Sequence, residues 1–212
     1  MNLKIFYKYL SEHSDIALAF DEHKKYVREE FSGDDEKYKA SVSGFINGVL
    51  NCADNKDVII RGERILIRTA CIDDADFMSE AERENSPWVG NWNICLRIQK
   101  FGDNDFLQTI IEKSDGTPVG FIIFRDMLNE NQTELKRIVI TEKEKGYGKE
   151  ALYLAQKFAF EILKTNRLQL GTRKDNIRAQ TIYKATGFTA AEPDPCTFFY
   201  IDKDNYFKRN QL

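Results

Sequence analysis

The chain has 212 residues, enough to bury a sizeable core as one domain with an appendage or as two small domains. Hydrophobic residues make up 42% of the sequence and aromatic residues 12%, which excludes a disordered chain. The formal net charge of −3 gives no electrostatic reason to expect nucleic acid or an anionic membrane as a partner, whereas an acidic surface tolerates a cationic substrate.

Cysteine and histidine usage argues against metal and thiol chemistry. Cys52, Cys71, Cys95 and Cys196 form no C-x-x-C pair, so neither a zinc ribbon nor a thioredoxin-like site is expected. His13 and His23 are the only histidines, and a Cys/His nucleophile pair is not expected. The N-terminus lacks the apolar core of a signal peptide, and no apolar run approaches the roughly 18 residues of a membrane span. We therefore expect a cytoplasmic protein with free thiols.

Residues 1–56 are expected to form a helical N-terminal extension. Ser14 and Asp15 are a plausible cap for a helix that ends before Gly33. A second helix is predicted from the apolar spacing between Tyr38 and Leu50. Both helices carry an apolar stripe that must be buried against another element.

The pattern changes from Val58, where short β-type runs begin. The first half of this region predicts strands and one helix in the order Val58–Ile60, Ile65–Ile67, a helix from Asp73 or Asp74 to Glu82, and an irregular to helical stretch Pro87–Lys100. Three strands follow, at Phe106–Ile111, Pro118–Phe124 and Thr133–Ile140.

The last third alternates helices and strands. A helix opens near Gly148, and then come strand Arg167–Leu170, helix Asn176–Ala185 and strand Phe198–Ile201. Strands on both sides of a long helix imply at least one parallel pair inside a largely antiparallel sheet. The fold class is therefore α/β, with a mixed, mostly antiparallel sheet and flanking helices in a domain spanning residues 57–212.

The turn Lys143–Glu150 joins a predicted strand to a predicted helix. The first turn of a helix leaves about four amides without intrahelical partners and favours an anion. Glycines at 146 and 148 allow close approach of a ligand, and three nearby lysines add positive charge. The spacing fits neither the P-loop nor the dinucleotide fingerprint. An isolated Gly-x-Gly often makes only a tight turn, so neighbouring motifs must decide.

Three segments in order resemble the GCN5-related N-acetyltransferase (GNAT) superfamily, with most similarity to its ribosomal-protein-alanine and polyamine acetyltransferase type. They are Glu134–Ile140, the turn Lys143–Gly148, and Asn176–Phe188. Ile67–Ala70 followed by Asp73–Ala75 also resembles the first strand and helix start of that family. The resemblance covers about residues 61–201.

The resemblance implies acetyl-CoA as co-substrate and no metal. Ile138, Val139 and Ile140 would present backbone groups to the pantetheine arm between two splayed strands. The diphosphate would lie on the turn, with contacts from Lys143, Lys145, Gly146, Tyr147, Gly148 and Lys149. Asn176 would also contact the cofactor, or serve as a helix N-cap, or both. Lys143 occupies a position where the family has Arg or Gln, and this departure should weaken anchoring without abolishing it.

Two catalytic residues are carried over from the resemblance. Tyr183 would protonate the departing thiolate, since a phenol with an unperturbed pKa near 10 is protonated at neutral pH. Its spacing of seven from Asn176 places both on one helix face. Glu134 is the candidate general base that deprotonates the amine, and an oxyanion would be held by backbone N–H near Val139. The alternatives are that Tyr183 is a residue at the edge of the core and that Glu134 is a solvated glutamate at a strand edge or pairs with Lys136 or Arg137.

Trp88, Trp92 and Glu84 fall in the segment that lines the acceptor side in this family. An aromatic wall with a nearby carboxylate would suit an amine or a peptide N-terminus. The alternative is that the tryptophans are structural.

We therefore expect an acetyl-CoA-dependent N-acetyltransferase that acts by direct attack of a primary amine of a small molecule or a protein N-terminus. The alternative is an acyl-CoA-binding regulatory or sensor protein whose residues 1–55 bind a partner or dimerise, so a homodimer is compatible with the sequence. A weaker alternative makes that segment a structural cap. The sequence does not select the acceptor.

Overall fold

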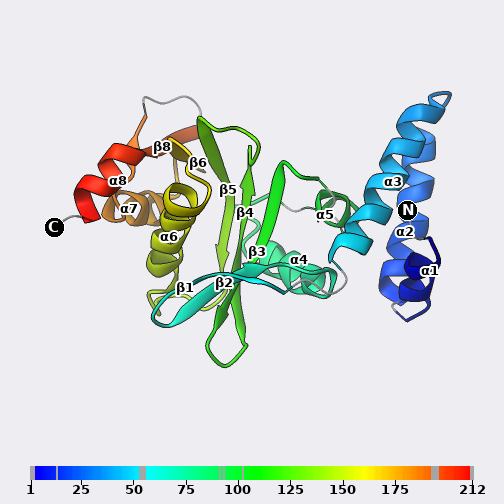
Figure 1. Ribbon diagram of the computed structural model, residues 1–212, viewed down its shortest axis with the longest axis horizontal. Helices are drawn as coiled ribbons and strands as arrows, with labels where there is room; N and C mark the ends of the chain where they lie inside the picture. Colours follow the sequence, from blue (N-terminus) through cyan, green and yellow to red (C-terminus); the bar gives the residue numbers. More distant parts are fainter. Residues whose placement is uncertain are drawn as a thin grey trace.

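The computed structural model describes residues 3–12, 14–52, 56–90, 92, 94–101, 103–191 and 196–210 (Figure 1). The helical elements are α1 (Leu3–Glu12), α2 (Ser14–Glu30), α3 (Asp35–Cys52), the 3₁₀ turn η1 (Ile72–Asp74), α4 (Ala75–Glu84), α5 (Ile94–Phe101), α6 (Tyr147–Lys157), the π-helical segment η2 (Phe158–Ile162), α7 (Ile177–Ala185) and α8 (Lys203–Asn210). The strands are β1 (Val58–Arg61), β2 (Ile65–Thr69), β3 (Phe106–Lys113), β4 (Pro118–Arg125), β5 (Gln132–Ile140), β6 (Arg167–Arg173), β7 (Thr189–Ala190) and β8 (Cys196–Asp202).

The strands form one sheet in the order β1-β2-β3-β4-β5-β6-β8-β7. All neighbouring pairs are antiparallel except β5 and β6, which are parallel and flank α6 in the sequence. The predicted mixed, mostly antiparallel α/β fold is confirmed, including its parallel pair.

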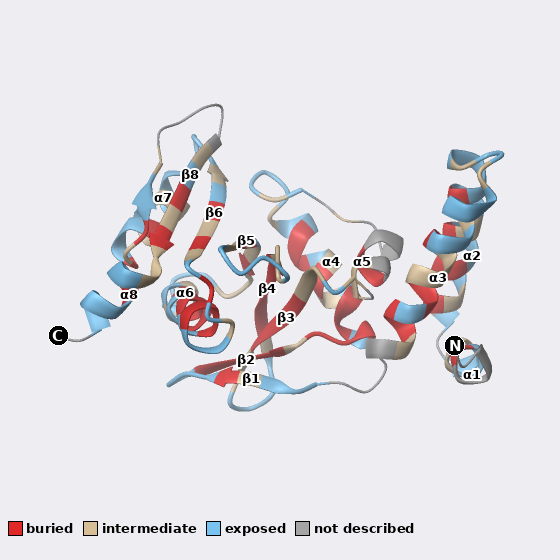
Figure 2. Cartoon of the chain, turned by 45° about the horizontal axis from the view of Figure 1, so that its top comes forward, coloured by how far each residue is buried: buried red, intermediate tan, exposed pale blue. Residues whose placement is uncertain are grey.

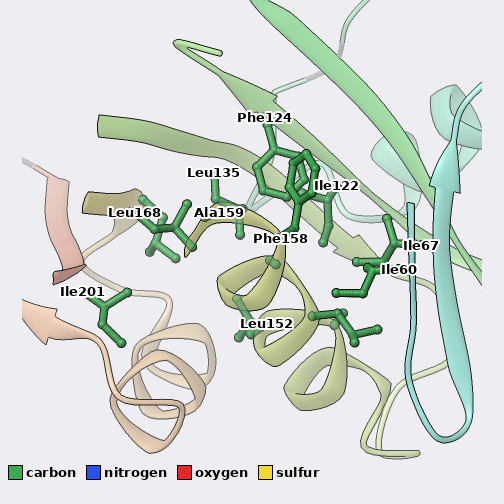
Figure 3. Packing of buried hydrophobic residues seen from close by; sticks show 14 of the residues in the cluster. Ile60, Ile67, Ile122, Phe124, Leu135, Leu152, Phe158, Ala159, Leu168 and Ile201 are labelled. Carbon is green, nitrogen blue, oxygen red and sulfur yellow. The ribbon is translucent and has the colours of Figure 1, made fainter. Parts of the chain in front are cut away.

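Helices cover both faces of this sheet and bury two separate clusters. On one face, Leu152 of α6 and Phe158 of η2 pack against sheet residues such as Ile122, Phe124 and Leu168 (Figure 3). On the other face, Met78 and Ala81 of α4 pack against alternate residues of β3, β4 and β5, among them Phe121 and Val139. The strands between them are buried on both sides, which explains their nearly continuous apolar sequence.

A bulge in β5 changes which face its side chains occupy. Ile123 of β4 pairs with Arg137, but Phe124 pairs with Leu135, so Lys136 is an extra residue on β5. Because strand side chains alternate with a period of two, one extra residue moves the following side chains to opposite faces. Leu135 belongs to the α6 face, and Val139, four residues later, belongs to the α4 face. We call this irregularity the Lys136 bulge.

The N-terminal segment forms three helices, α1 to α3, where the sequence predicted two. They lie at one end of the molecule beside α5 (Figures 1 and 2). Their apolar cluster contains Phe6, Phe20 and Phe45 and also Ile72 and Ile98 from the rest of the chain. The helical extension therefore shares a core with α5, and its boundary at residue 56 stays a prediction.

Several local features differ from expectation. Asp74 is the N-cap residue of α4, but its carboxylate makes no cap hydrogen bond there; it accepts from Cys71 N at 2.8 Å and from Arg68 Nη1 at 2.7 Å. The short strand β7 and helix α8 were not predicted. In α8 only Tyr206 is buried, so its sequence lacks an apolar stripe.

Candidate active site

A cavity of about 940 Å³ opens beside the C-terminal part of β5. Its walls come from five parts of the chain: residues 85 and 88–90 after α4, residues 135–140 of β5, residues 142–149 without 145 together with 152 of α6, residues 171–172 of β6, and residues 175–179 with 182–183 around α7. Segments far apart in the sequence therefore meet at one site.

The cavity exists because β5 and β6 pair only at their beginnings. Their parallel register covers Gln132 with Arg167, Thr133 with Leu168, and Glu134 with Gln169, and it ends there. Beyond this point β5 faces the cavity on the edge that β6 would otherwise occupy. Backbone groups of Ile138–Ile140 at such an edge can bind an extended ligand arm as if it were another strand.

The glycine turn, defined as Lys143–Lys149, lies at the mouth of this gap. Gly146 is the N-cap residue of α6 and has a φ of 82°, a left-handed conformation that favours glycine. A Cβ on Gly148 would make only an ordinary contact of 3.5 Å with Ile140. The fold itself therefore does not require glycine at this position, and the missing side chain chiefly allows a ligand in the cavity to approach the backbone. Lys143, Tyr147 and Lys149 line the cavity, whereas Lys145 does not.

Arg64, in the loop between β1 and β2, braces the glycine turn. Its Nη1 donates to Lys145 O at 2.8 Å, and its Nε donates to Glu150 Oε2 at 2.9 Å. Glu150 also accepts from the backbone N–H of Arg64 at 2.9 Å. Burial alone would raise the pKa of Glu150, but these hydrogen bonds and the Arg64 charge lower it overall. The turn is thereby held to the first strands.

Lys143 connects the turn to the opposite wall. Its Nζ donates to Asn85 Oδ1 at 2.6 Å and also to Ile140 O. Burial lowers the pKa of Lys143, nearby Arg178 lowers it further, and Glu84 opposes both effects. Two neighbouring cations that share the edge of one cavity are well placed to bind a phosphate.

Asn176 and Tyr183 both line the cavity from α7. Asn176 is the N-cap of α7, since its Oδ1 accepts from the Ala179 backbone N–H at 3.2 Å, so only its Nδ2 is left to donate to a ligand. Tyr183 packs edge-on against Phe199 with ring centroids 5.5 Å apart. Burial raises the pKa of Tyr183 to about 12, so the phenol keeps its proton at neutral pH.

Glu134 does not line the cavity. It forms an ion pair with Arg125 on β4, and its Oε1 lies 3.6 Å from Lys136 Nζ. Its side chain is only 13% exposed. A role as base therefore stays a prediction, and it would require this carboxylate to leave its ion pairs or to act through water.

The predicted acceptor residues are only partly brought together. Trp88 lines the cavity and is half exposed, whereas Glu84 and Trp92 do not line it. The Trp92 ring lies 4.9 Å from the Arg137 guanidinium and 5.9 Å from that of Arg97. Glu84 is exposed at the end of α4, near Lys143.

Sequence reasoning missed three features of the site. Arg64 gave no motif signal, because it lies in a loop remote in sequence from the glycine turn, and Arg178 was given no role although it falls within the segment Asn176–Phe188. The buried cluster of Glu82, Arg97 and Arg137 joins α4, α5 and β5, and no spacing in the sequence links these positions.

The remaining candidates for metal and thiol chemistry lie elsewhere. Within the described residues, no group of three His, Cys, Asp or Glu side chains could hold a metal ion. His23 lies in α2, where its ring stacks on Phe45, and His13 is outside the described residues. Cys71 is buried with a free thiol. No helix in the described parts of the chain is long and apolar enough to cross a membrane.

Comparisons with known proteins agree with this architecture. Residues 64–189 match the family model described as the acetyltransferase (GNAT) domain, whereas no curated protein matches the sequence. The spermidine N-acetyltransferase of Vibrio cholerae in complex with CoA and spermine is similar with a TM-score of 0.61 and 16% identity, over 69% of this chain and 99% of that chain. A GNAT-family acetyltransferase from Bacillus anthracis is similar with a TM-score of 0.59 and 18% identity, over 68% of this chain and 98% of that chain. Because the family model matches more than half of its length, the chain belongs to the GNAT family of acetyltransferases.

Proposed function

We propose that this protein transfers the acetyl group of acetyl-CoA to a primary amine of a small molecule or a protein N-terminus. The observation that carries the proposal is the gap between β5 and β6, which has the glycine turn at its mouth and Tyr183 on its wall. Family membership supports acetyl transfer, and the Vibrio cholerae structure with CoA and spermine supports a CoA thioester and an amine as the two substrates.

Acetyl-CoA would be bound mainly by backbone groups. Ile138, Val139 and Ile140 would accept the pantetheine arm along the free edge of β5. Amides of the first turn of α6, with Lys143, Lys149 and the unpredicted Arg178, would hold the diphosphate. Asn176 would donate from Nδ2. Lys145 does not line the cavity, so a contact from it to the cofactor stays a prediction.

The transfer itself needs three proton and charge movements. The neutral amine attacks the thioester carbonyl, forming the C–N bond while the C–S bond breaks. Backbone N–H near Val139 would hold the negative charge that develops on the acetyl oxygen. Tyr183 would give its proton to the departing sulfur, and the proton lost by the nitrogen would leave through a base.

Glu134 remains our candidate for that base. If it acts, Glu134→Gln should lower kcat/KM at pH 7 more than at pH 9, because the amine loses its own proton at high pH. The pH profile of kcat/KM measures this difference. Lys136→Gln, which removes one of the two ion-pair partners of Glu134, is the matched control. An equal loss at both pH values would exclude Glu134 as the base.

The experiment that tests the function is a free-thiol release assay with acetyl-CoA and a panel of amines and N-terminal peptides. The rival is an acyl-CoA-binding sensor whose helical extension, residues 1–56, binds a partner. Binding of acetyl-CoA by calorimetry without thiol release over the whole panel would favour this rival. Tyr183 in the cavity wall favours the enzyme.

The assembly and location of the protein are also proposals. We propose a cytoplasmic protein that forms a homodimer or a larger homo-oligomer. A dodecameric structure of the Vibrio cholerae enzyme, similar with a TM-score of 0.60 and 16% identity, supports self-association. Light scattering of the purified chain measures its oligomeric state.

A further inference from the structure

A charged cluster lies buried between β5 and the helices that cover it. Glu82 of α4 and Arg97 of α5 have fully buried side chains, and the Arg137 side chain of β5 is 9% exposed. Arg97 Nη2 lies 2.8 Å from Glu82 Oε2, and Arg137 Nη1 contacts Glu82 Oε1. We call these three residues the Arg–Glu–Arg cluster.

The cluster carries more positive than negative charge. Two guanidinium groups share one carboxylate, and that carboxylate also accepts from Trp92 N at 2.9 Å. Arg97 Nη1 donates to the neutral Gln108 at 3.2 Å, while Arg97 Nε has no hydrogen-bond partner within the described structure. Uncompensated charge is costly away from water, so an additional anion beside this cluster would be stabilising. In agreement, burial lowers the pKa of Arg97, Glu82 only partly opposes this, and the Arg137 charge lowers it further.

Arg137 connects the cluster to the cavity. It lines the cavity, and a Cβ built on Gly90, another lining residue, would lie 3.5 Å from Arg137 Nη2. The Lys136 bulge explains this position, because it places Arg137 on the α4 face, where Glu82 is. Val139, where the acetyl group is proposed to lie, is two residues further along β5, or about 7 Å.

The wall opposite β5 offers no negative charge at this point. Residues from the segment after α4 that line the cavity are Asn85, Trp88, Val89 and Gly90, none of which is acidic. Two of the acidic residues that line other parts, Glu142 and Asp175, have basic partners of their own at 3.1 and 3.0 Å, and the third, Glu144, lies in the glycine turn on the proposed cofactor side. The Glu82 carboxylate that contacts Arg137 is fully buried and does not line the cavity, so a polycationic acceptor would meet the Arg137 cation there without a cavity-lining carboxylate to bind its second amine.

We propose that Arg137 binds an anionic group of the acceptor, so that the substrate is a primary amine carrying a carboxylate a few atoms from its nitrogen. Glu82 and Arg97 act as positioning residues that fix the Arg137 guanidinium. This inference rests on the proposed function of the same cavity. It distinguishes this chain from spermidine N-acetyltransferases, whose named substrates are cations.

The test compares acceptors that differ only in charge. Thiol release is measured for 4-aminobutyrate and 4-aminobutanamide, for Ala-Asp and Ala-Asn dipeptides with amidated C-termini, and for spermidine. We expect kcat/KM to favour the carboxylate of at least one pair by about 10- to 100-fold, as for a charge-assisted hydrogen bond. Preference within the first pair points to a free amino carboxylate, and preference within the second to an acidic peptide. Equal use of both members of each pair, or a preference for spermidine, would overturn the inference.

Variants assign that preference to the cluster. Arg137→Gln should abolish the preference, mainly by raising KM for the carboxylate, while acetyl-CoA affinity stays within about threefold. Arg83→Gln, which removes an exposed charge beside Glu82 on α4, should keep the preference. A preference that survives in Arg137→Gln would overturn the assignment. Thermal melting shows whether each variant is folded. Arg137→Lys provides a second variant, which keeps the charge but loses the planar guanidinium group, and we expect it to lose part of the preference for the carboxylate.

A binding measurement separates failure of this inference from failure of the proposed function. The wild-type protein, saturated with CoA, is titrated by calorimetry with 4-aminobutyrate and with 4-aminobutanamide. Selective binding of the carboxylate without turnover of any amine would sustain the inference and refute the catalytic proposal. Turnover of amines without a preference for the carboxylate, in either the binding or the thiol-release assay, would sustain the catalytic proposal and refute the inference.

Discussion

The two halves of the cavity are built in different ways. The proposed cofactor half consists of the glycine turn and the start of α7, which are short continuous segments that we expect to act largely through backbone groups. The proposed acceptor half consists of single side chains from α4, α5 and β5, held together by a buried charge cluster. Backbone recognition leaves a local motif in the sequence, whereas recognition by side chains from distant elements leaves none.

The largest expected effect concerns the acceptor half, where Glu82→Gln removes the only carboxylate of the Arg–Glu–Arg cluster. Two buried guanidinium groups would then lack a counter-charge, and we expect the free energy of unfolding to fall by about 3–5 kcal/mol. Denaturant unfolding measures this loss. Glu80→Gln, which breaks an exposed ion pair on the same helix, should have a much smaller effect on the free energy of unfolding, because solvent screens that pair. Similar losses for the two variants would mean that the cluster does not stabilise the fold.

The next effect concerns the cofactor half, where Gly146→Glu places a side chain and a negative charge in the proposed diphosphate site. Gly146 has a φ of 82°, and a Cβ there would lie 3.1 Å from Arg64 Nη2. We expect acetyl-CoA affinity to fall by more than about 100-fold, from charge repulsion and lost backbone contacts. Calorimetry measures it. The control is Gly33→Glu, since Gly33 has a similar φ of 86° and no atom lies within 4 Å of a Cβ built there. This variant should leave acetyl-CoA affinity unchanged. Unchanged affinity in Gly146→Glu would refute the cofactor site.

Between the two halves, Tyr183→Phe should lower kcat by about 100-fold without changing acetyl-CoA affinity. A thiol-release assay measures kcat, and calorimetry measures the affinity for acetyl-CoA. Tyr206→Phe, which changes a second buried tyrosine outside the cavity, should have the kcat of the wild type. A kcat that is the same in Tyr183→Phe and the wild type would remove the phenol from the chemistry.

The pH dependence of the wild type sharpens that test. Since the pKa of Tyr183 is raised to about 12, the protonated donor form persists as the pH rises past the usual tyrosine value near 10. We therefore expect no loss of kcat from ionisation of this residue between pH 8 and pH 10. A twofold fall in kcat centred near pH 10 in the wild type, absent from Tyr183→Phe, would contradict the raised pKa of Tyr183.

The smallest expected effect is that of Arg64→Met, which removes the brace on the glycine turn. Arg64 does not line the cavity, so acetyl-CoA affinity should fall by only about 3- to 10-fold, through loosening of the turn. The neighbouring exposed Arg61→Met should have no effect on the same calorimetric titration. An effect as large as that of Gly146→Glu would mean that Arg64 itself contacts the cofactor.

Much of the fold was predictable because it follows local rules. Apolar runs, turn residues and the glycine turn indicated most strands, the long helix α6 and the parallel β5–β6 pair. Helix α8 was missed because a single buried residue, Tyr206, gives no periodicity. The third N-terminal helix was missed because α1 and α2 follow each other with only residue 13 between them.

Most residues predicted for the cofactor side line one cavity, whereas those predicted for the acceptor side do so only in part. Trp92 was expected to face a substrate, yet its ring packs on Arg97 and Arg137, and only the folded chain brings these three together. Arg137 was considered only as an ion-pair partner of Glu134. The structure pairs Glu134 with Arg125 and Lys136, and pairs Arg137 with Glu82.

The Lys136 bulge also affects how this chain should be aligned with other proteins. Residues before and after the bulge are out of phase by one position, since Leu135 and Val139 belong to opposite faces of the sheet although an even spacing of four positions would place them on the same face. An alignment with a strand that lacks the extra residue must open a gap at Lys136. Without that gap, Arg137 would be matched to a core position of the α6 face, and its place beside the cavity would be lost from the comparison.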